Sequence, residues 1–127
     1  MKDTIILSST GIVMGFLSSL VGLPGGVELA LWAAFYVLWV VYGLHVEIVS
    51  PVRRMSFAST LAGLLAGSIQ VILMEQYRVN NPWYSASFET STASDLSTAL
   101  LGQGIGFGLL CGLVTGIIVS RLQARRS

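Results

Sequence analysis

The sequence predicts an all-α integral membrane protein in which four transmembrane helices pack as one compact bundle. Of its 127 residues, 54% are hydrophobic and only 10% are charged, whereas an ordinary soluble domain has roughly 25% charged residues. The apolar residues form four runs of about 18–27 residues, each long enough to cross a hydrocarbon core of about 30 Å. Small residues recur every fourth position in three runs, which is typical of closely packed membrane helices.

The four runs cover about residues 4–22, 27–44, 55–74 and 96–122. Each should form a helix, because backbone polar groups find no water partners inside a bilayer. The first two runs are separated by the turn sequence Leu23-Pro24-Gly25-Gly26, so their helices should be antiparallel neighbours. One transmembrane domain is therefore expected to cover residues 1–127.

The two later connections differ in length and composition. The connection between the second and third runs carries Pro51 and a pair of arginines. The connection at about 75–95 is longer and rich in Ser, Thr and Asn, which predicts an exposed loop. Either Ser94 or Asp95 can cap the last helix by accepting a hydrogen bond from its free N–H groups.

The positions of the basic residues predict the orientation of the bundle. With four crossings, one end carries Lys2, Arg53, Arg54, Arg121, Arg125 and Arg126. The other end carries Arg78 among acidic residues. Because cytoplasmic segments of membrane proteins are enriched in Lys and Arg, both termini should be cytoplasmic and the long loop should lie outside. The expected location is a bacterial inner membrane.

Rows of small residues on three of the predicted helices indicate close helix contacts. The rows are Gly104, Gly108, Gly112, Gly116 and Ser120; Ser59, Gly63 and Gly67; and Gly11, Gly15 and Ser19. Grooves without side chains let a neighbouring backbone approach and gain van der Waals contact. Glycine is also simply commoner in membrane helices. Three rows are more than one compact bundle needs, so at least one is expected to contact another subunit.

The second predicted helix carries a stripe of large rings. Trp32, Phe35, Trp39 and Tyr42 recur at spacings of three and four, with Tyr36 beside them. Such a stripe fills space against lipid or against a glycine groove. It also suits contact with a flat hydrophobic ligand such as a quinone, a carotenoid or a chlorin pigment. The sequence requires no cofactor and does not distinguish these readings.

One glutamate and two glutamines stand out among the polar residues of the predicted spans. Glu28 sits in the first turn of the second helix, where the helix dipole favours a carboxylate, and it could equally handle a proton or a cation. Gln70 and Gln103 lie deeper, and amides at such positions often bond across helices. Gln103 would line a polar path if the last helix faced a pore.

No constellation of residues predicts catalysis, a cofactor site or a metal site, so the protein is not expected to be an enzyme. His45 is the single histidine, and it is read as an edge residue at the membrane interface rather than as a ligand of haem or chlorophyll. Cys111 is read as a small apolar contact residue. The sparse basic residues give no basis for binding nucleic acid.

The long loop contains the sequence Asn81-Pro82-Trp83-Tyr84, with Phe88 close behind. Trp and Tyr are enriched at the headgroup level of membranes, so this segment is expected to anchor the loop at the interface. It is also the best candidate for a docking site on the outer face.

A resemblance supports the same topology. The segment Ala62-Gly63-Leu64-Leu65-Ala66-Gly67, followed by Tyr77, Asn81-Pro82 and a glycine-rich final helix, resembles a family of small four-helix bacterial membrane proteins of unknown function. The resemblance covers the second half of the chain. It implies four helices and no catalytic activity, and it assigns no functional residue.

These observations predict a small non-catalytic accessory subunit that packs through its glycine-rich faces into a larger membrane protein complex or a homo-oligomer. Its expected partners are membrane lipids and other membrane protein subunits or further copies of itself. The alternative is a small oligomeric transporter or channel with Glu28, Gln70 or Gln103 on the path.

Overall fold

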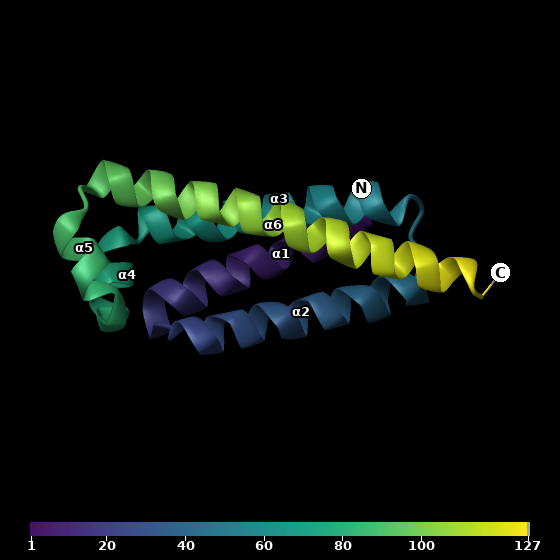
Figure 1. Cartoon of the computed structure of the whole chain (residues 1–127), viewed down its shortest axis with the longest axis horizontal. Coiled ribbons are helices and arrows are strands. Elements are labelled where there is room, and N and C mark those ends of the chain that lie inside the picture. The colour runs from purple at the N-terminus through teal and green to yellow at the C-terminus, as the bar shows by residue number, and fades with distance from the viewer. Residues whose placement is uncertain (127) are drawn as a thin grey trace.

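The computed structural model describes residues 1–126, and four long helices account for most of them (Figure 1). These are α1, Lys2–Phe16, which continues into a π-helical turn at Leu17–Val21; α2, Gly25–His45; α3, Pro51–Ile72; and α6, Ala93–Ala124. All four, the first taken together with its π-helical turn, are long and apolar enough to cross a membrane. The predicted all-α bundle with four candidate spans is confirmed.

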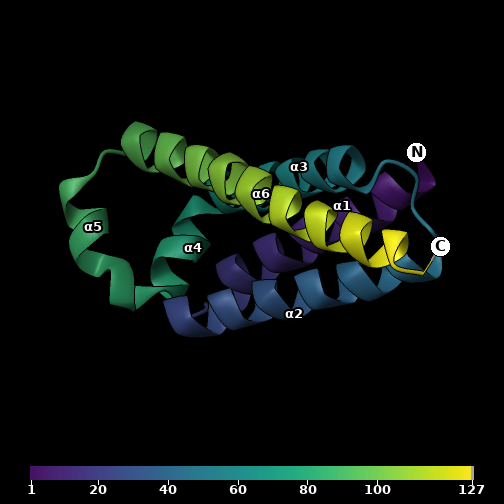
Figure 2. The same cartoon turned by 45° about the vertical axis from the view of Figure 1, so that its right-hand side comes forward.

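Short helical segments occupy much of the stretch that was predicted to be a loop. They are α4, Met74–Asn80; a 3-10 turn, Pro82–Tyr84; and α5, Ser85–Thr90. These segments lie at one end of the bundle, which we call the loop end, and both termini lie at the opposite, terminal end (Figures 1 and 2). Helical turns satisfy many backbone groups internally, which an extended loop would leave to water or lipid headgroups.

Two helices begin differently from the prediction. α3 already begins at Pro51, because proline is favoured in the first turn, where a missing N–H costs no hydrogen bond. The N-cap of α6 is Thr92 rather than Ser94 or Asp95. The Thr92 hydroxyl accepts a bond from the Asp95 N–H, and the Asp95 carboxylate accepts one from the Thr92 N–H, so the two residues form a capping box.

α3 is the central helix and packs closely on α1 and on α6. In its most apolar stretch 50% of the residues are buried, against 17% for α2. α2 contacts α6 near the terminal end, where Gly43 faces Val119. The two helices diverge toward the loop end in both views (Figures 1 and 2). α2 is therefore the least covered of the four spans.

The small-residue rows of α3 and α6 meet each other. A methyl group at Gly63 would overlap the carbonyl oxygen of Gly104, and one at Gly108 would overlap that of Ser59. Farther along, a methyl group at Gly112 would come within 2.7 Å of the Met55 carbonyl oxygen. The two backbones are therefore in direct contact, which any larger side chain in these rows would prevent.

The row of α1 also finds its partner within the chain. A methyl group at Gly11 would overlap the Ala62 carbonyl oxygen, and one at Gly15 would meet Ala66 of the same helix. Ser19 is fully buried in the π-helical turn. The rows predicted on all three helices thus contact helices of the same chain, and they do not by themselves require a second protein.

The connections at the two ends of α2 have left-handed backbone. Gly22, before α2, has φ 80°, and a Cβ atom there would overlap the Asn80 carbonyl oxygen. Glu47 and Ser50, between α2 and α3, have φ 48° and 53°. Non-glycine residues rarely adopt this conformation, so both connections turn sharply.

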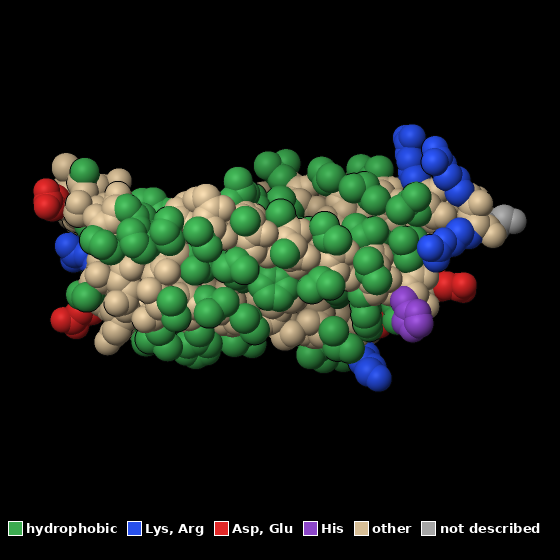
Figure 3. Space-filling model, turned by 90° about the horizontal axis from the view of Figure 1, so that it is seen from below, with side chains coloured by type: hydrophobic (Ala, Val, Ile, Leu, Met, Phe, Trp, Pro, Cys, Tyr) green, Lys and Arg blue, Asp and Glu red, His purple; other side chains and the backbone are tan. Residues whose placement is uncertain are grey.

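The surface has the pattern of a membrane protein. Hydrophobic side chains cover the middle of the face seen in Figure 3, and Lys and Arg side chains gather at the terminal end. At that end Asp3 accepts hydrogen bonds from Tyr42 at 2.8 Å and from Arg54 at 3.2 Å, joining α1, α2 and α3.

Candidate functional site

A cavity of about 510 Å³ opens where α2 and α6 diverge, between α2, α3 and α6 and beneath α4 and α5. Its polar lining residues are Glu28, Gln70, Tyr77, Tyr84, Ser87 and Gln103. Its aromatic lining residues are Trp32, Tyr36, Phe88 and Phe107, in addition to Tyr77 and Tyr84. A pocket of this size, with a few convergent polar groups, is of the kind that holds a small organic ligand.

Four glycines contribute backbone atoms to the wall of this cavity. Gly63 and Gly67 of α3, with Gly104 and Gly108 of α6, line the cavity as well as forming the contact between those helices. Their missing side chains would point into the backbone of the facing helix, whereas Gln103 and Phe107 of α6 reach toward α2. The rows that were predicted as packing faces therefore also form one wall of the cavity.

The cavity ends about halfway along the bundle. Along α2 its lining runs from Gly25 to Tyr36, about 17 Å at 1.5 Å per residue, against a hydrocarbon core of about 30 Å. The Tyr36 hydroxyl is hydrogen-bonded to the Ser59 hydroxyl at 2.6 Å. Beyond this point Met55 and Val119 are completely buried, so the bundle is closed toward the terminal end.

Glu28 is the one charged side chain among the lining residues. It is half-buried, and the indole of Trp32, one helical turn away, lies within hydrogen-bonding range. Within residues 1–126 the single ion pair joins Arg54 to Asp3, so no cationic side chain is paired with Glu28. A carboxylate at membrane depth is costly unless something compensates its charge.

The tyrosines near Glu28 remain neutral. Burial, and then the nearby Glu28 carboxylate, raise the pKa of Tyr77 well above its ordinary value. The same two causes raise the pKa of Tyr84. Both phenols therefore keep their protons at physiological pH, and they can offer hydrogen bonds but no charge to a ligand.

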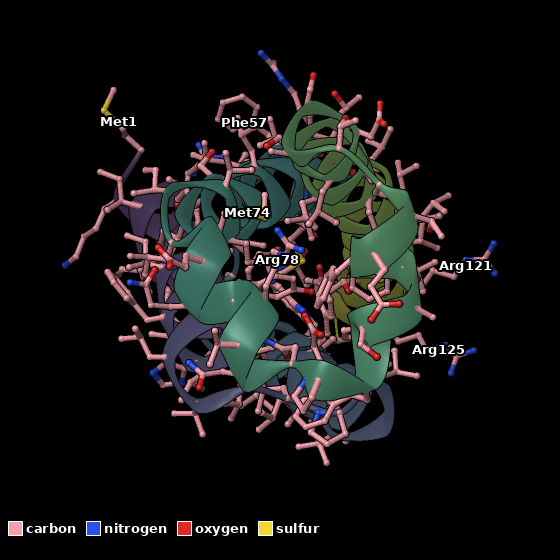
Figure 4. The ribbon with its side chains drawn as sticks, turned by 90° about the vertical axis from the view of Figure 1, so that its left-hand side faces the viewer. Met1, Phe57, Met74, Arg78, Arg121 and Arg125 are labelled. Atoms are coloured by element: carbon pink, nitrogen blue, oxygen red, sulfur yellow. The ribbon has the colours of Figure 1, made fainter. Side chains whose placement is uncertain are left out.

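Arg78 lies at the entrance on the loop end. Its guanidinium stacks on the Phe88 ring at 5.8 Å, which links α4 to α5. Seen from this end, Arg78 lies in the middle of the bundle, between the two short helices (Figure 4). The basic Arg78 side chain thus lies beside the entrance of a cavity whose wall carries the acidic Glu28 side chain.

The two deep amides have different roles. Gln70 is buried and donates a hydrogen bond to the Ser18 hydroxyl at 2.8 Å, which confirms the predicted bond across helices. Gln103 is exposed on the cavity wall, and within the described residues it makes no such bond. Gln103 is therefore free to meet a ligand.

The aromatic stripe of α2 does not form one ligand-binding face. Trp32 lines the cavity, whereas Trp39 is buried in the core and Phe35 packs against it. Tyr42 is tied to Asp3 at the terminal end. The stripe divides because α2 packs tightly near that end and separates from the bundle near the loop end.

The segment predicted as a docking site is divided in the same way. Asn81 is completely buried and is not available to a partner, which corrects the prediction for this residue. Pro82 and Trp83 are exposed, and Tyr84 lines the cavity. The Tyr84 and Phe88 rings pack edge to face at 6.2 Å. Only the Pro82-Trp83 portion keeps docking as a prediction.

Sequence reasoning missed Phe107 and a second hollow beside it. Phe107 is the one aromatic residue among the glycines of α6, and this position could have marked it as a candidate site residue. It packs on Trp32 at 6.1 Å and on Tyr36 at 6.4 Å. On its other side lies an apolar groove of about 420 Å³ between α2 and α6, which shares Leu29, Tyr36 and Phe107 with the cavity.

Other chemistry finds little support among the described residues. No group of His, Cys, Asp and Glu within residues 1–126 is arranged to hold a metal ion. His45 is exposed at the terminal end of α2, away from the cavity. Cys111 is half-buried and lines the apolar groove.

Comparison with known protein families, with curated proteins and with solved structures gave no match.

Proposed function

We propose that the protein is a small membrane transporter or channel that binds a cationic solute in the cavity beside Glu28. The observation that carries this proposal is a carboxylate that has no cationic partner among residues 1–126, on the wall of a cavity that reaches about halfway through the bundle. Ionisable residues at membrane depth are commonly placed on ion or substrate pathways, where the bound cation compensates their charge. Gln103 and the Tyr84 hydroxyl supply neutral polar contacts.

The charge distribution supports a cytoplasmic terminal end, since basic residues gather there (Figure 3). With that orientation the cavity opens to the outer side of the membrane. Two groups of contacts close the opposite end: Asp3 with Tyr42 and Arg54, and the Gln123 amide, which donates to the Gly43 carbonyl at 3.2 Å. Transport would require a second state in which these contacts open.

Flux through proteoliposomes tests the proposal. Purified protein is reconstituted, and the uptake of potassium, of protons and of a radiolabelled organic ammonium ion into the vesicles is followed. The wild-type protein should carry at least one of these cations, and Glu28→Gln should abolish the flux. Glu75→Gln is the matched control, because it removes an exposed carboxylate at the same end of the bundle. Equal flux from wild-type and Glu28→Gln protein would refute the proposal.

A second candidate is an accessory subunit or homo-oligomer, favoured by two glycines that have no neighbours. Gly102 and Gly106 are exposed on α6, and a Cβ atom at either would meet nothing within 4 Å. Such positions suit a close contact with another helix. Native mass spectrometry in mild detergent should then show an assembly that Gly106→Leu disrupts. A wild-type protein that is monomeric at every concentration, and that mild detergent extracts from its native membrane without a partner, would exclude this candidate.

A further inference from the structure

The aromatic rings of the cavity form a cluster. The Trp32 and Tyr36 rings stack with centroids 6.0 Å apart, and Phe107 of α6 approaches both edge to face. All three line the cavity, and Glu28 lies one turn of α2 from Trp32. A carboxylate beside a cluster of aromatic rings is an arrangement that recognises organic ammonium ions, through charge together with cation–π attraction.

The size of the cavity argues against a bare inorganic ion as its ligand. A volume of about 510 Å³ falls within the range of sites for organic molecules. Rings cannot replace the oxygen atoms that hydrate a small cation, because they offer only quadrupole attraction. A quaternary ammonium group is weakly hydrated and has methyl groups that can lie against the rings, so it loses little on entering.

The adjoining groove extends the site in an apolar direction. It shares Leu29, Tyr36 and Phe107 with the cavity and continues along α2 as far as Val40. Apart from Tyr36, Cys111 and Thr115, its lining residues are aliphatic or aromatic hydrocarbon side chains. α2 is the least covered span, and Leu29 and Val37 are exposed on its surface, so the groove faces the lipid side of the bundle.

We propose that the ligand is an amphipathic organic cation whose quaternary ammonium head lies between Glu28 and the rings of Trp32, Tyr36 and Phe107, with its alkyl chain in the groove between α2 and α6. This inference rests on the proposed function and specifies its substrate class. Because the groove faces lipid, such a ligand enters sideways from the bilayer as well as from the loop end.

Calorimetric titration of the protein in lipid nanodiscs tests the ligand class. The bilayer consists of phosphatidylethanolamine and phosphatidylglycerol, so that no lipid carries a quaternary ammonium group. Three probes separate the parts of the site: decyltrimethylammonium, tetramethylammonium with the same head and no chain, and decyl sulfate with the same chain and a negative head. The first should bind at least about tenfold more tightly than either of the others, a difference of about 1.4 kcal/mol. Equal binding of decyl sulfate would overturn the inference.

Matched variants locate the site. Glu28→Gln should weaken decyltrimethylammonium binding by about tenfold or more, while Glu75→Gln leaves it unchanged. Phe107→Leu keeps an apolar side chain but removes a ring, and it should weaken binding by about three- to tenfold. Phe57→Leu is its control, because Phe57 is an exposed ring pointing away from the bundle (Figure 4). Circular dichroism and gel filtration show whether each variant is folded, and unchanged binding by folded Glu28→Gln and Phe107→Leu proteins would overturn the inference.

Two further outcomes separate the inference from the proposed function and from a lipid ligand. Potassium or proton flux that requires Glu28, without binding of decyltrimethylammonium, would overturn the inference and leave the proposed function standing. Decyltrimethylammonium binding that requires Glu28, without flux of any cation, would overturn the proposed transport and leave the assignment of the ligand standing. If phosphatidylcholine in the nanodisc abolishes decyltrimethylammonium binding, the occupant is a lipid headgroup and the free amphiphile is excluded.

Discussion

Asn81 connects α4 to the end of the first span through three hydrogen bonds. Its amide nitrogen donates to the Ser18 and Tyr77 carbonyls, both at 2.7 Å, and its amide oxygen accepts from the Leu23 N–H at 3.1 Å. The π-helical turn disturbs the regular ladder of backbone bonds near Ser18, and Asn81 supplies a partner there. The sequence suggested an exposed docking residue, because an Asn-Pro pair is typical of surface turns and nothing local reveals a partner 63 residues away.

Replacing Asn81 with Ala should therefore destabilise the protein by about 2–4 kcal/mol, because several buried backbone groups lose their partners. Thermal unfolding in detergent, followed by circular dichroism, measures the effect. Asn80→Ala is the control: Asn80 is half-buried, and its side chain makes one bond, to the Ser19 carbonyl at 2.9 Å. A smaller loss for Asn81→Ala than for Asn80→Ala would contradict this account of the loop end.

Two glycines on α6 give a second test at this scale. Gly104→Ala introduces a methyl group into the Gly63 backbone and should cost about 1–3 kcal/mol through overpacking. Gly106→Ala meets nothing within 4 Å, and it should leave stability unchanged or raise it by up to about 1 kcal/mol through helix propensity. Unfolding by added denaturing detergent compares the two. Equal effects would mean that α3 and α6 are not in backbone contact.

The sequence predicted that the four helices exist, and how long they are, better than it predicted which helices pack against each other. Hydropathy locates the four spans because the bilayer imposes a minimum length on each. The small-residue rows indicate that helices touch, but they do not indicate which helix fills which groove. In the structure α3 has two adjacent faces of small residues, with Gly63 toward α6 and Ala62 toward α1. The three rows of small residues therefore find their contacts within one chain.

The start of α6 allows a test at the scale of one helix. Thr92→Ala removes the capping box and should cost about 1 kcal/mol, with faster hydrogen exchange confined to the first turns of α6. Thr98→Ala is the control, because the Thr98 hydroxyl bonds only back to the Ser94 carbonyl in the helix interior. Exchange measured by mass spectrometry distinguishes the two variants. Unchanged exchange in Thr92→Ala would show that other contacts hold the start of this helix.

For the whole molecule, the sequence predicted the topology but not the cavity. The even number of spans places both termini at one end, as observed (Figure 1). The cavity lies where α2 diverges from α6, whereas the two helices pack together near Gly43 (Figure 1), and no local sequence pattern predicts this divergence. Glu28 was recognised as a candidate because it is an ionisable residue just inside a predicted span. Phe107 was not, because its role depends on facing Trp32 across that gap.

The terminal end provides a test of the proposed transport at the scale of the whole molecule. Asp3→Asn removes the ion pair with Arg54, so a state that is open at this end should become easier to reach. A partly exposed pair contributes up to about 1 kcal/mol, and flux should therefore rise by up to about fivefold. Glu47→Gln, an exposed carboxylate at the same end, should leave flux unchanged. A slower Asp3→Asn protein would indicate that opening this end does not limit transport.

Tight connections with left-handed backbone, at Gly22 and at Glu47 and Ser50, join α2 to its neighbours in the chain. α1 and α6 each contact α3 backbone to backbone, whereas α2 is held to the other spans through side chains, such as Tyr36 bonded to Ser59 and Tyr42 bonded to Asp3. We therefore expect that, in any conformational change, α2 moves as a unit relative to α1, α3 and α6. A ligand in the cavity between α2, α3 and α6 would restrict this motion. Hydrogen exchange should then slow in α2 far more than in the other three spans.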